Sequence, residues 1–226
     1  GHADNDFALV RFKADGLRDT NFGPGGNGGV VQTDFGGGSS AAMAITLQPD
    51  GKIVLAGTRY FLPVPDGVLL GESMLARLNS DGSLDATFGT GGIVTDQIFG
   101  STFRYESEFL DIVRQTDGKL VALGYGSDAF RDNTIVVVNR YNADGTLDAT
   151  FVGDGRAELA VHAFGSSMDT LLLFSDGRLL IAGEDNRGTL QFVRLTANGT
   201  LDTTFSGDGI ASLDISGGLG GVIVNG

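Results

Sequence analysis

The stretch Gln48-Pro-Asp-Gly-Lys-Ile-Val-Leu-Ala-Gly57 decides the fold, because its Asp-Gly pair lies between two apolar runs. It recurs as Gln115-Thr-Asp-Gly-Lys-Leu-Val-Ala-Leu-Gly124 and as Phe174-Ser-Asp-Gly-Arg-Leu-Leu-Ile-Ala-Gly183. Asp-Gly between apolar runs is a strong β-hairpin signal, since a type I′ turn needs positive φ at both central residues. The sequence therefore predicts three hairpins of one design.

A second element recurs between these hairpins. It consists of an apolar run with an Arg, an Asp-Gly or Asn-Gly turn, a segment of the type Leu-Asp-x-x-Phe, and a Gly that opens another short strand. The spacing between the turn glycines is 66, 63 and 54 residues, from Gly16 to Gly82, Gly145 and Gly199. A repeat of this length with four short strands is typical of a β-propeller blade.

Four strands, A to D, make up each expected repeat. Strand A is expected at 41–48, 107–115 and 167–174, strand B at 52–57, 119–124 and 178–183, strand C at 7–13, 73–79, 134–141 and 189–196, and strand D at 29–34, 92–97, 156–161 and 209–214. Residues 106–115 alone also suit a helical period, but their place before an Asp-Gly turn predicts a strand. Strands B and C are apolar on both faces, as a sheet packed between two others requires.

We predict an all-β propeller, or a propeller segment, of about four blades with four antiparallel strands each. The expected divisions are a half blade at 1–40, blades at 41–97, 98–161 and 162–214, and a closing or continuing strand within 215–226. Unpaired strand edges at the two ends of an unclosed ring predict closure or self-association.

The repeat resembles the delta-60 repeat family, which is found in long secreted or surface proteins of bacteria. The resemblance rests on Gln-Pro-Asp-Gly-Lys-Ile at 48–53, Arg-Tyr-Asn-Ala-Asp-Gly at 140–145 and Leu-Asp-Ala-Thr-Phe-Gly at 84–89. It covers nearly the whole chain, and departs from the pattern at Val152 and Ser206, where Gly is usual. The resemblance implies a propeller fold and an extracellular or cell-surface location, rather than a particular chemistry.

Composition narrows the classes of function. The 226 residues carry a formal net charge of −13, which argues against binding nucleic acid or anionic lipid, because phosphates repel it. The chain has no cysteine, which excludes disulfides, thiolate catalysis and zinc–thiolate sites. No stretch approaches the ~20 apolar residues that span a bilayer, so we expect no membrane insertion.

No motif of the chain carries an enzymatic reaction. The stretch Gly23-Pro-Gly-Gly-Asn-Gly28 fits G-x-G-x-x-G, but a strand is expected after it, and a dinucleotide site needs a helix there. His2 and His162 are the only histidines, and neither G-x-S-x-G nor H-E-x-x-H occurs. A carboxylate pair assembled from different blades, as in propeller glycosidases, stays open. We name no catalytic residue and favour a non-enzymatic function.

An Arg and an Asp recur at fixed positions of the repeat. An Arg within an apolar strand should be paired, since an unpaired buried charge is very costly. We predict a structural Arg–Asp latch in each blade, formed by Arg11, Arg77, Arg140 and Arg194 with Asp19, Asp85, Asp148 and Asp202. The alternative is calcium binding by Asn142, Asp144 and Asp148, whose spacing loosely resembles an oxygen-ligand loop without its terminal Glu.

Strand direction places any ligand-binding surface at one end of the blades. The A–B and C–D connections share one end and carry the repeated turns, whereas the B–C and D–A connections share the other end and carry the irregular inserts. Exposed aromatic residues and Arg are enriched in binding surfaces. The candidate ligand-binding residues of the inserts are Tyr60, Phe61, Phe103, Arg104, Tyr105, Phe130, Arg131 and Arg187.

These observations favour a non-enzymatic binding or scaffold module of a secreted or cell-surface bacterial protein. A glycan or an extended peptide would suit the Tyr and Arg side chains as partner. The alternatives are a calcium-assisted carbohydrate-binding module and a propeller glycosidase. Apart from that calcium, we expect no cofactor.

Overall fold

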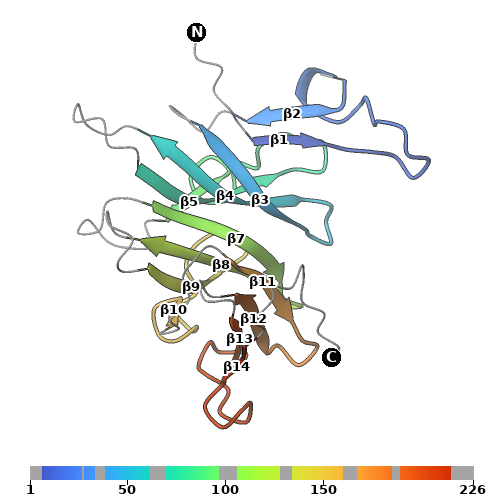
Figure 1. The fold of residues 1–226 in the computed structure, drawn as a ribbon. Helices are drawn as coiled ribbons and strands as arrows, with labels where there is room; N and C mark the ends of the chain where they lie inside the picture. The colour runs from blue at the N-terminus through green and yellow to red at the C-terminus, as the bar shows by residue number, and fades with distance from the viewer. Residues whose placement is uncertain are drawn as a thin grey trace.

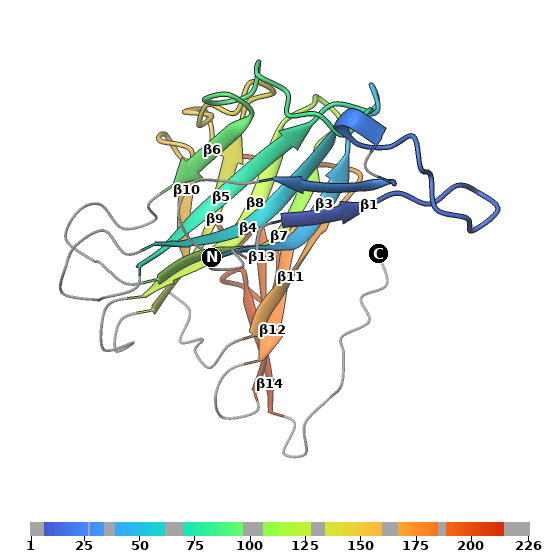
Figure 2. The ribbon, with the colours of Figure 1, turned by 90° about the horizontal axis from the view of Figure 1, so that it is seen from above.

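The computed structural model describes residues 7–26, 28–33, 39–61, 70–96, 106–127, 134–159, 167–184 and 189–214. Within these ranges the fold is all-β, with one short 3-10 turn at Pro24–Gly26. Figures 1 and 2 show successive small sheets that face one another along the chain. The described residues contain no helix that is long and apolar enough to cross a membrane.

In the described ranges, fourteen strands form one two-stranded and three four-stranded sheets, all antiparallel and in chain order. The half blade has β1 (Phe7–Val10) and β2 (Val30–Thr33). Blade I has β3 (Ser40–Leu47), β4 (Ile53–Phe61), β5 (Leu70–Leu78) and β6 (Ile93–Asp96). Blade II has β7 (Glu106–Arg114), β8 (Leu120–Ser127), β9 (Thr134–Tyr141) and β10 (Arg156–Leu159). Blade III has β11 (Ser167–Leu173), β12 (Leu179–Glu184), β13 (Thr189–Leu195) and β14 (Ile210–Asp214).

The propeller-type repeat predicted from the sequence is confirmed, and the strand bounds mostly agree within two or three residues. The main difference is β4, which continues to Phe61 instead of ending at Gly57. The expected closing or continuing strand within 215–226 lies outside the described residues.

The Asp-Gly turns differ in type from the expected type I′ turn. Gly51 has φ +83°, but Asp50 is not among the residues with positive φ. The Gly51 amide donates to the Gln48 carbonyl at 2.9 Å, and the Gln48 amide donates to the Lys52 carbonyl at 2.8 Å. This pattern is a type I turn followed by a left-handed glycine, the usual arrangement of a three-residue hairpin loop. It leaves the predicted hairpin and its register unchanged.

The glycine that ends the repeated strand B motif has a steric reason. Strand A of each four-stranded blade carries a β-bulge, which in blade I lies between Ala42 and Ala44, next to the Ala42–Gly57 pair. A Cβ atom at Gly57 would lie 1.9 Å from the Ala41 carbonyl oxygen. No other residue fits there, because the bulge brings the two backbones together.

Over the described residues the core consists of three layers, each between adjacent sheets. One layer joins the half blade to blade I, the next joins blades I and II, and the third joins blades II and III. Leu55 faces the half blade, whereas Val54 faces blade II, and both are buried. Alternate residues of one strand therefore supply two cores, which explains why strands B and C lack polar alternation.

Candidate functional site

The antiparallel strand order divides the molecule into two ends. The A–B and C–D connections of every blade lie at one end, here called the turn end. The last residues of strands B and D and the first residues of strands A and C lie at the other end, here called the loop end. Each end brings together a different set of polar side chains.

The turn end holds one Arg–Asp pair in each blade. In blade II, Arg140 Nε donates to Asp148 Oδ2 at 2.7 Å, and Arg140 Nη2 donates to Thr150 Oγ1 at 3.0 Å. The guanidinium carbon lies 4.7 Å from the centre of the Phe151 ring. Lys119 Nζ adds a second cation 2.9 Å from Asp148. The pairs Arg11–Asp19, Arg77–Asp85 and Arg194–Asp202 repeat this contact at 2.7–2.9 Å.

Three of these arginines also cross to the following blade, which the sequence did not predict. Each Nη1 donates to the carbonyl that precedes the next Asp-Gly or Asn-Gly turn: Arg11 to Ser80, Arg77 to Ala143, and Arg140 to Ala197. Each of these guanidinium groups lies over a Phe ring, here called the latch Phe: Phe22, Phe88 or Phe151. The amide of the residue after the latch Phe donates to the next carbonyl of the same turn: Gly23 to Asp81, Gly89 to Asp144, and Val152 to Asn198, at 2.7–3.0 Å. The latch therefore fixes both the C–D loop and the joint between blades.

Hydrogen bonds and cations hold the latch aspartates ionised. Burial opposes ionisation of Asp85 and Asp148, but the Lys and Thr hydrogen bonds and the Arg charge outweigh it and hold the pKa of each carboxyl well below its usual range. In blade III, hydrogen bonds from Thr204 and the charge of Arg194 outweigh burial and lower the pKa of Asp202 to about 2. These carboxylates are accordingly charged at neutral pH.

The three calcium candidates have protein partners. Asp148 is paired with Arg140, and Asp144 Oδ1 accepts hydrogen bonds from the Thr146 amide and hydroxyl at 2.9 and 2.7 Å. Asn142 Nδ2 donates to the Thr146 hydroxyl at 3.0 Å. Over the described ranges, no group of three or more His, Asp or Glu side chains is placed to hold a metal ion.

The loop end of blade I carries an aromatic and charged cluster. Tyr60 and Phe61 form the last two positions of β4, opposite Gly71 and Leu70, and their side chains are half-buried. Arg59 Nη2 lies 2.5 Å from Glu72 Oε2, and its guanidinium carbon lies 5.3 Å from the centre of the Phe61 ring. The other candidates, Phe103, Arg104, Tyr105, Phe130, Arg131 and Arg187, lie outside the described residues.

Blade II continues this polar edge. The Tyr125 hydroxyl donates to Glu108 Oε2 at 3.0 Å, and Glu108 is buried. Ser107 joins the two blades, because its Oγ accepts from the Ser73 amide at 2.9 Å and its carbonyl accepts from the Thr58 hydroxyl at 3.1 Å. The loop end is thus braced across the joint between blades I and II.

A polar network between blades I and II is a second feature that the sequence did not predict. Asp96 Oδ2 accepts from the Tyr141 hydroxyl at 2.6 Å and from Asn139 Nδ2 at 2.7 Å, and Arg156 Nη2 lies 2.5 Å from Asp96 Oδ1. Burial, and then the charge of Asp96, raises the pKa of Tyr141. The repeat holds the available signal, because Tyr141 and Arg156 stand where the other full blades have Leu and Ile.

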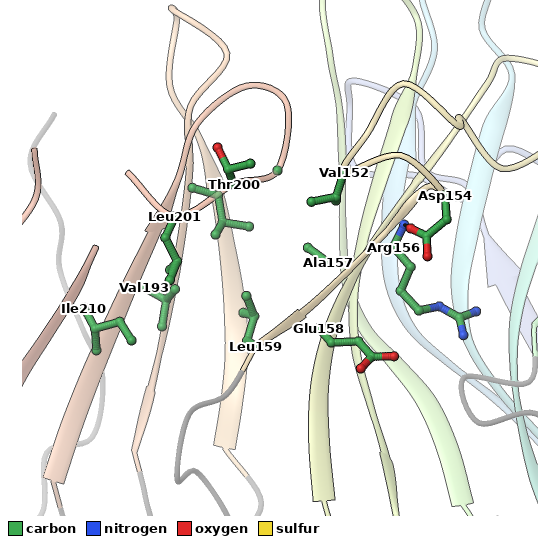
Figure 3. A pocket seen from close by; sticks show the side chains of 12 residues that line it. Val152, Asp154, Arg156, Ala157, Glu158, Leu159, Val193, Thr200, Leu201 and Ile210 are labelled. Atoms are coloured by element: carbon green, nitrogen blue, oxygen red, sulfur yellow. Dashed lines mark hydrogen bonds between the residues drawn. The ribbon is translucent and has the colours of Figure 1, made fainter. Parts of the chain in front are cut away.

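A cleft of about 520 Å³ opens between blades II and III. Its walls are mainly apolar, with Val152, Ala157 and Leu159 facing Val193 and Ile210 (Figure 3). In Figure 3 the Arg156 guanidinium points away from this cleft, which agrees with its ion pair to Asp96 of blade I. The cleft offers apolar surface and little convergent polar chemistry.

A comparison with protein families agrees with this architecture. The family described as "Domain of unknown function (DUF5122) beta-propeller" matches residues 48–88, 115–151 and 175–205. Among solved structures, a beta-fructofuranosidase of glycoside hydrolase family 32 from Bombyx mori shares 13% identity and a TM-score of 0.38 over 81% of this chain. The match spans 38% of that enzyme, and no curated protein matched the sequence. Each of the three DUF5122 matches covers an Asp-Gly turn and the latch that follows it, so the family model matches the repeated parts of the chain and supports a β-propeller-type repeat.

Proposed function

We propose that this chain is a non-enzymatic binding or scaffold module of a secreted or cell-surface bacterial protein, built from delta-60-type repeats. Its loop end would recognise an extended polar partner, a glycan or a peptide. One observation carries this proposal: the repeated latches lie at the turn end, whereas the loop end holds the unrepeated cluster of Arg59, Tyr60 and Phe61.

The chemistry of the loop end supports a polar partner. Tyr60 and Phe61 offer aromatic surface next to a charged pair, and aromatic groups beside polar ones suit the alternating apolar and hydroxyl faces of a sugar or the backbone of a peptide. The Ser107 bridge between two sheets holds this edge in place, so little conformational entropy would be lost on binding. Irregular connections on a rigid scaffold are the common location of binding residues.

The binding test uses the intact chain with arrays of glycans and of extended peptides. Phe61→Ala is expected to weaken the strongest interaction at least about tenfold, as loss of a central aromatic contact does. Phe174→Ala is the matched control, because Phe174 is also half-buried and lies 5.6 Å from a guanidinium carbon, that of Arg178, but at the turn end.

Binding that survives Phe61→Ala and is lost in Phe174→Ala would place the ligand at the turn end and contradict the proposal. Each array is measured with and without calcium, so that a metal-assisted interaction is recognised separately. Turnover of an arrayed glycan, seen as release of reducing sugar, would replace the proposal by a glycosidase.

A further inference from the structure

Every joint between neighbouring sheets uses two different faces. The earlier blade supplies an arginine face, made of the latch Arg, the latch Phe and the amide that follows this Phe. The later blade supplies a carbonyl face, made of the two carbonyls and the glycine of its C–D turn together with the inward side chains of strand C. Gly199 shows the fit, because a Cβ atom there would lie 2.6 Å from the Phe151 ring.

Blade III presents an arginine face that is left open among the described residues. Its Arg194 donates through Nε to Asp202 and through Nη2 to Thr204, but no carbonyl of the described residues accepts from Nη1, in contrast to its counterparts. The Ser206 amide likewise meets no turn carbonyl within the described ranges, whereas the Val152 amide of blade II donates to the Asn198 carbonyl of blade III. Phe205 is half-buried, whereas Phe22, Phe88 and Phe151 are fully buried under the next blade.

The half blade presents the complementary carbonyl face. Val10 and Phe12 are 40% and 63% exposed. Their counterparts in the three full blades, Ala76 and Leu78, Asn139 and Tyr141, and Val193 and Leu195, are at most 1% exposed, because each packs on the preceding blade. A Cβ atom at Gly16 would meet no atom within 4 Å, in contrast to Gly82, Gly145 and Gly199.

We propose that a second copy of this chain docks head to tail, with the carbonyl face of its half blade on the arginine face of blade III. Arg194 Nη1 would donate to the Ala14 carbonyl and the Ser206 amide to the Asp15 carbonyl, with Gly16 over the Phe205 ring. These contacts repeat the three joints within the chain, residue for residue. The occupant is a second copy because β1–β2 and β14 lie at opposite ends of the stack in Figure 1.

Such an interface is heterologous, so a head-to-tail pair retains one free carbonyl face and one free arginine face. Copies would therefore add until the rotation closes a ring, or would continue as a filament. The faces are apolar with a few directed hydrogen bonds, and burying Phe12 and Val10 supplies the main driving force. This inference does not depend on the proposed function, which concerns the loop end.

Sedimentation velocity over a range of concentrations tests the interface. The wild-type chain is expected to grow beyond the monomer as concentration rises. Phe12→Asp, on the carbonyl face, and Phe192→Asp, on the arginine face beside Arg194 in β13, are each expected to weaken association at least about tenfold. Val10→Asp is a second variant of the carbonyl face in case Phe12→Asp misfolds. Leu47→Asp is the control, since Leu47 is 66% exposed but takes no part in a joint.

Mixing the two variants gives the sharpest outcome. Phe12→Asp keeps its arginine face and Phe192→Asp keeps its carbonyl face, so the mixture should form a dimer and nothing larger. A mixture that stays monomeric, or a wild type that is monomeric at every concentration, overturns the proposal. A monomeric wild type whose melting temperature falls in Phe12→Asp but not in Leu47→Asp also overturns it, in favour of closure within one chain.

Discussion

At the scale of single residues, the repeats show which positions tolerate a side chain and which do not. Val152 and Ser206 have φ values of +49° and +54°, and they are the two non-glycine residues with positive φ in the described part of the chain. Their counterparts Gly23 and Gly89 also have positive φ. The sequence signalled this strain, because the pattern has Gly where these two residues stand. A branched side chain in this region costs about 1–2 kcal/mol.

Replacing Val152 by Gly should therefore stabilise the chain. Val152 is 44% exposed, so little burial is lost, and the relief of strain exceeds the added entropy of the unfolded chain by about 1 kcal/mol. Urea unfolding followed by circular dichroism measures this gain. The reverse change, Gly89→Val, should destabilise strongly, because a Cβ atom there would lie 2.2 Å from the Ile93 carbonyl oxygen. Equal stability of wild type and Val152→Gly would show that the loop relaxes around the valine.

The latch aspartates make stability depend on acid pH. The pKa of Asp202 falls from its ordinary 3.8 to about 2 on folding, and those of Asp85 and Asp148 are lowered as well. A carboxyl with a lowered folded pKa contributes stability that is fully present above the unfolded pKa and is lost as pH falls toward the folded pKa. The free energy of unfolding should thus stay level from pH 7 to about 5 and decline between about 4 and 2.

The variant Asp148→Asn isolates one latch. It should lose about 3 kcal/mol at pH 7, because Arg140 would remain buried without its counterion. Its stability should also fall less steeply than the wild type below about pH 4, since one carboxyl no longer takes up a proton. Urea titrations at several pH values compare the two slopes. Parallel slopes would show that the Asp148 carboxyl does not contribute to the acid transition.

At the scale of elements, the strands could be predicted from the repeat, whereas the contacts between blades could not. Residues 106–115 suit a helical period, yet their place before Asp117-Gly118 correctly predicted β7. The Arg–Asp contact within a blade follows from residues that recur together. The bond from Arg77 to the Ala143 carbonyl is invisible in sequence, because a backbone acceptor leaves no side-chain signature. The Asp96–Tyr141–Arg156 network escaped notice because it occurs once and does not repeat.

Two glycines separate the role of the turn from the role of the joint. Gly118 and Gly145 both have φ +89°, so an Ala at either position carries the same backbone strain, about 1 kcal/mol. A Cβ atom at Gly118 meets no atom within 4 Å, whereas at Gly145 it would lie 2.7 Å from Val94 Cγ2 and 3.0 Å from Phe88 Cε2. Gly145→Ala should therefore cost about 1–3 kcal/mol more than Gly118→Ala in urea unfolding. Equal losses would mean that the joint yields without cost.

At the scale of the whole molecule, the described sheets follow one another along the chain and differ in the number of neighbours against which they pack. Blade II packs on both sides, through the two cores that it shares with blades I and III. Among the described residues the half blade packs on one side only, and its two strands have four residues each. In a stack of this kind, stability is approximately the sum of the terms for each repeat and for each joint.

Local opening should therefore begin at the half blade when the protein is dilute. A two-stranded hairpin is barely stable by itself, so β1 and β2 depend on the core of Phe7, Phe22 and Val31 against blade I. Amide hydrogen exchange followed by mass spectrometry should show β1 and β2 exchanging first and β8 and β9 last, with the lowest and highest opening free energies. Gly82→Val should widen this gap, because its side chain would push Phe22 and Val31 out of the joint. If β1 and β2 instead exchanged as slowly as β8, the half blade would be held by more than its joint with blade I.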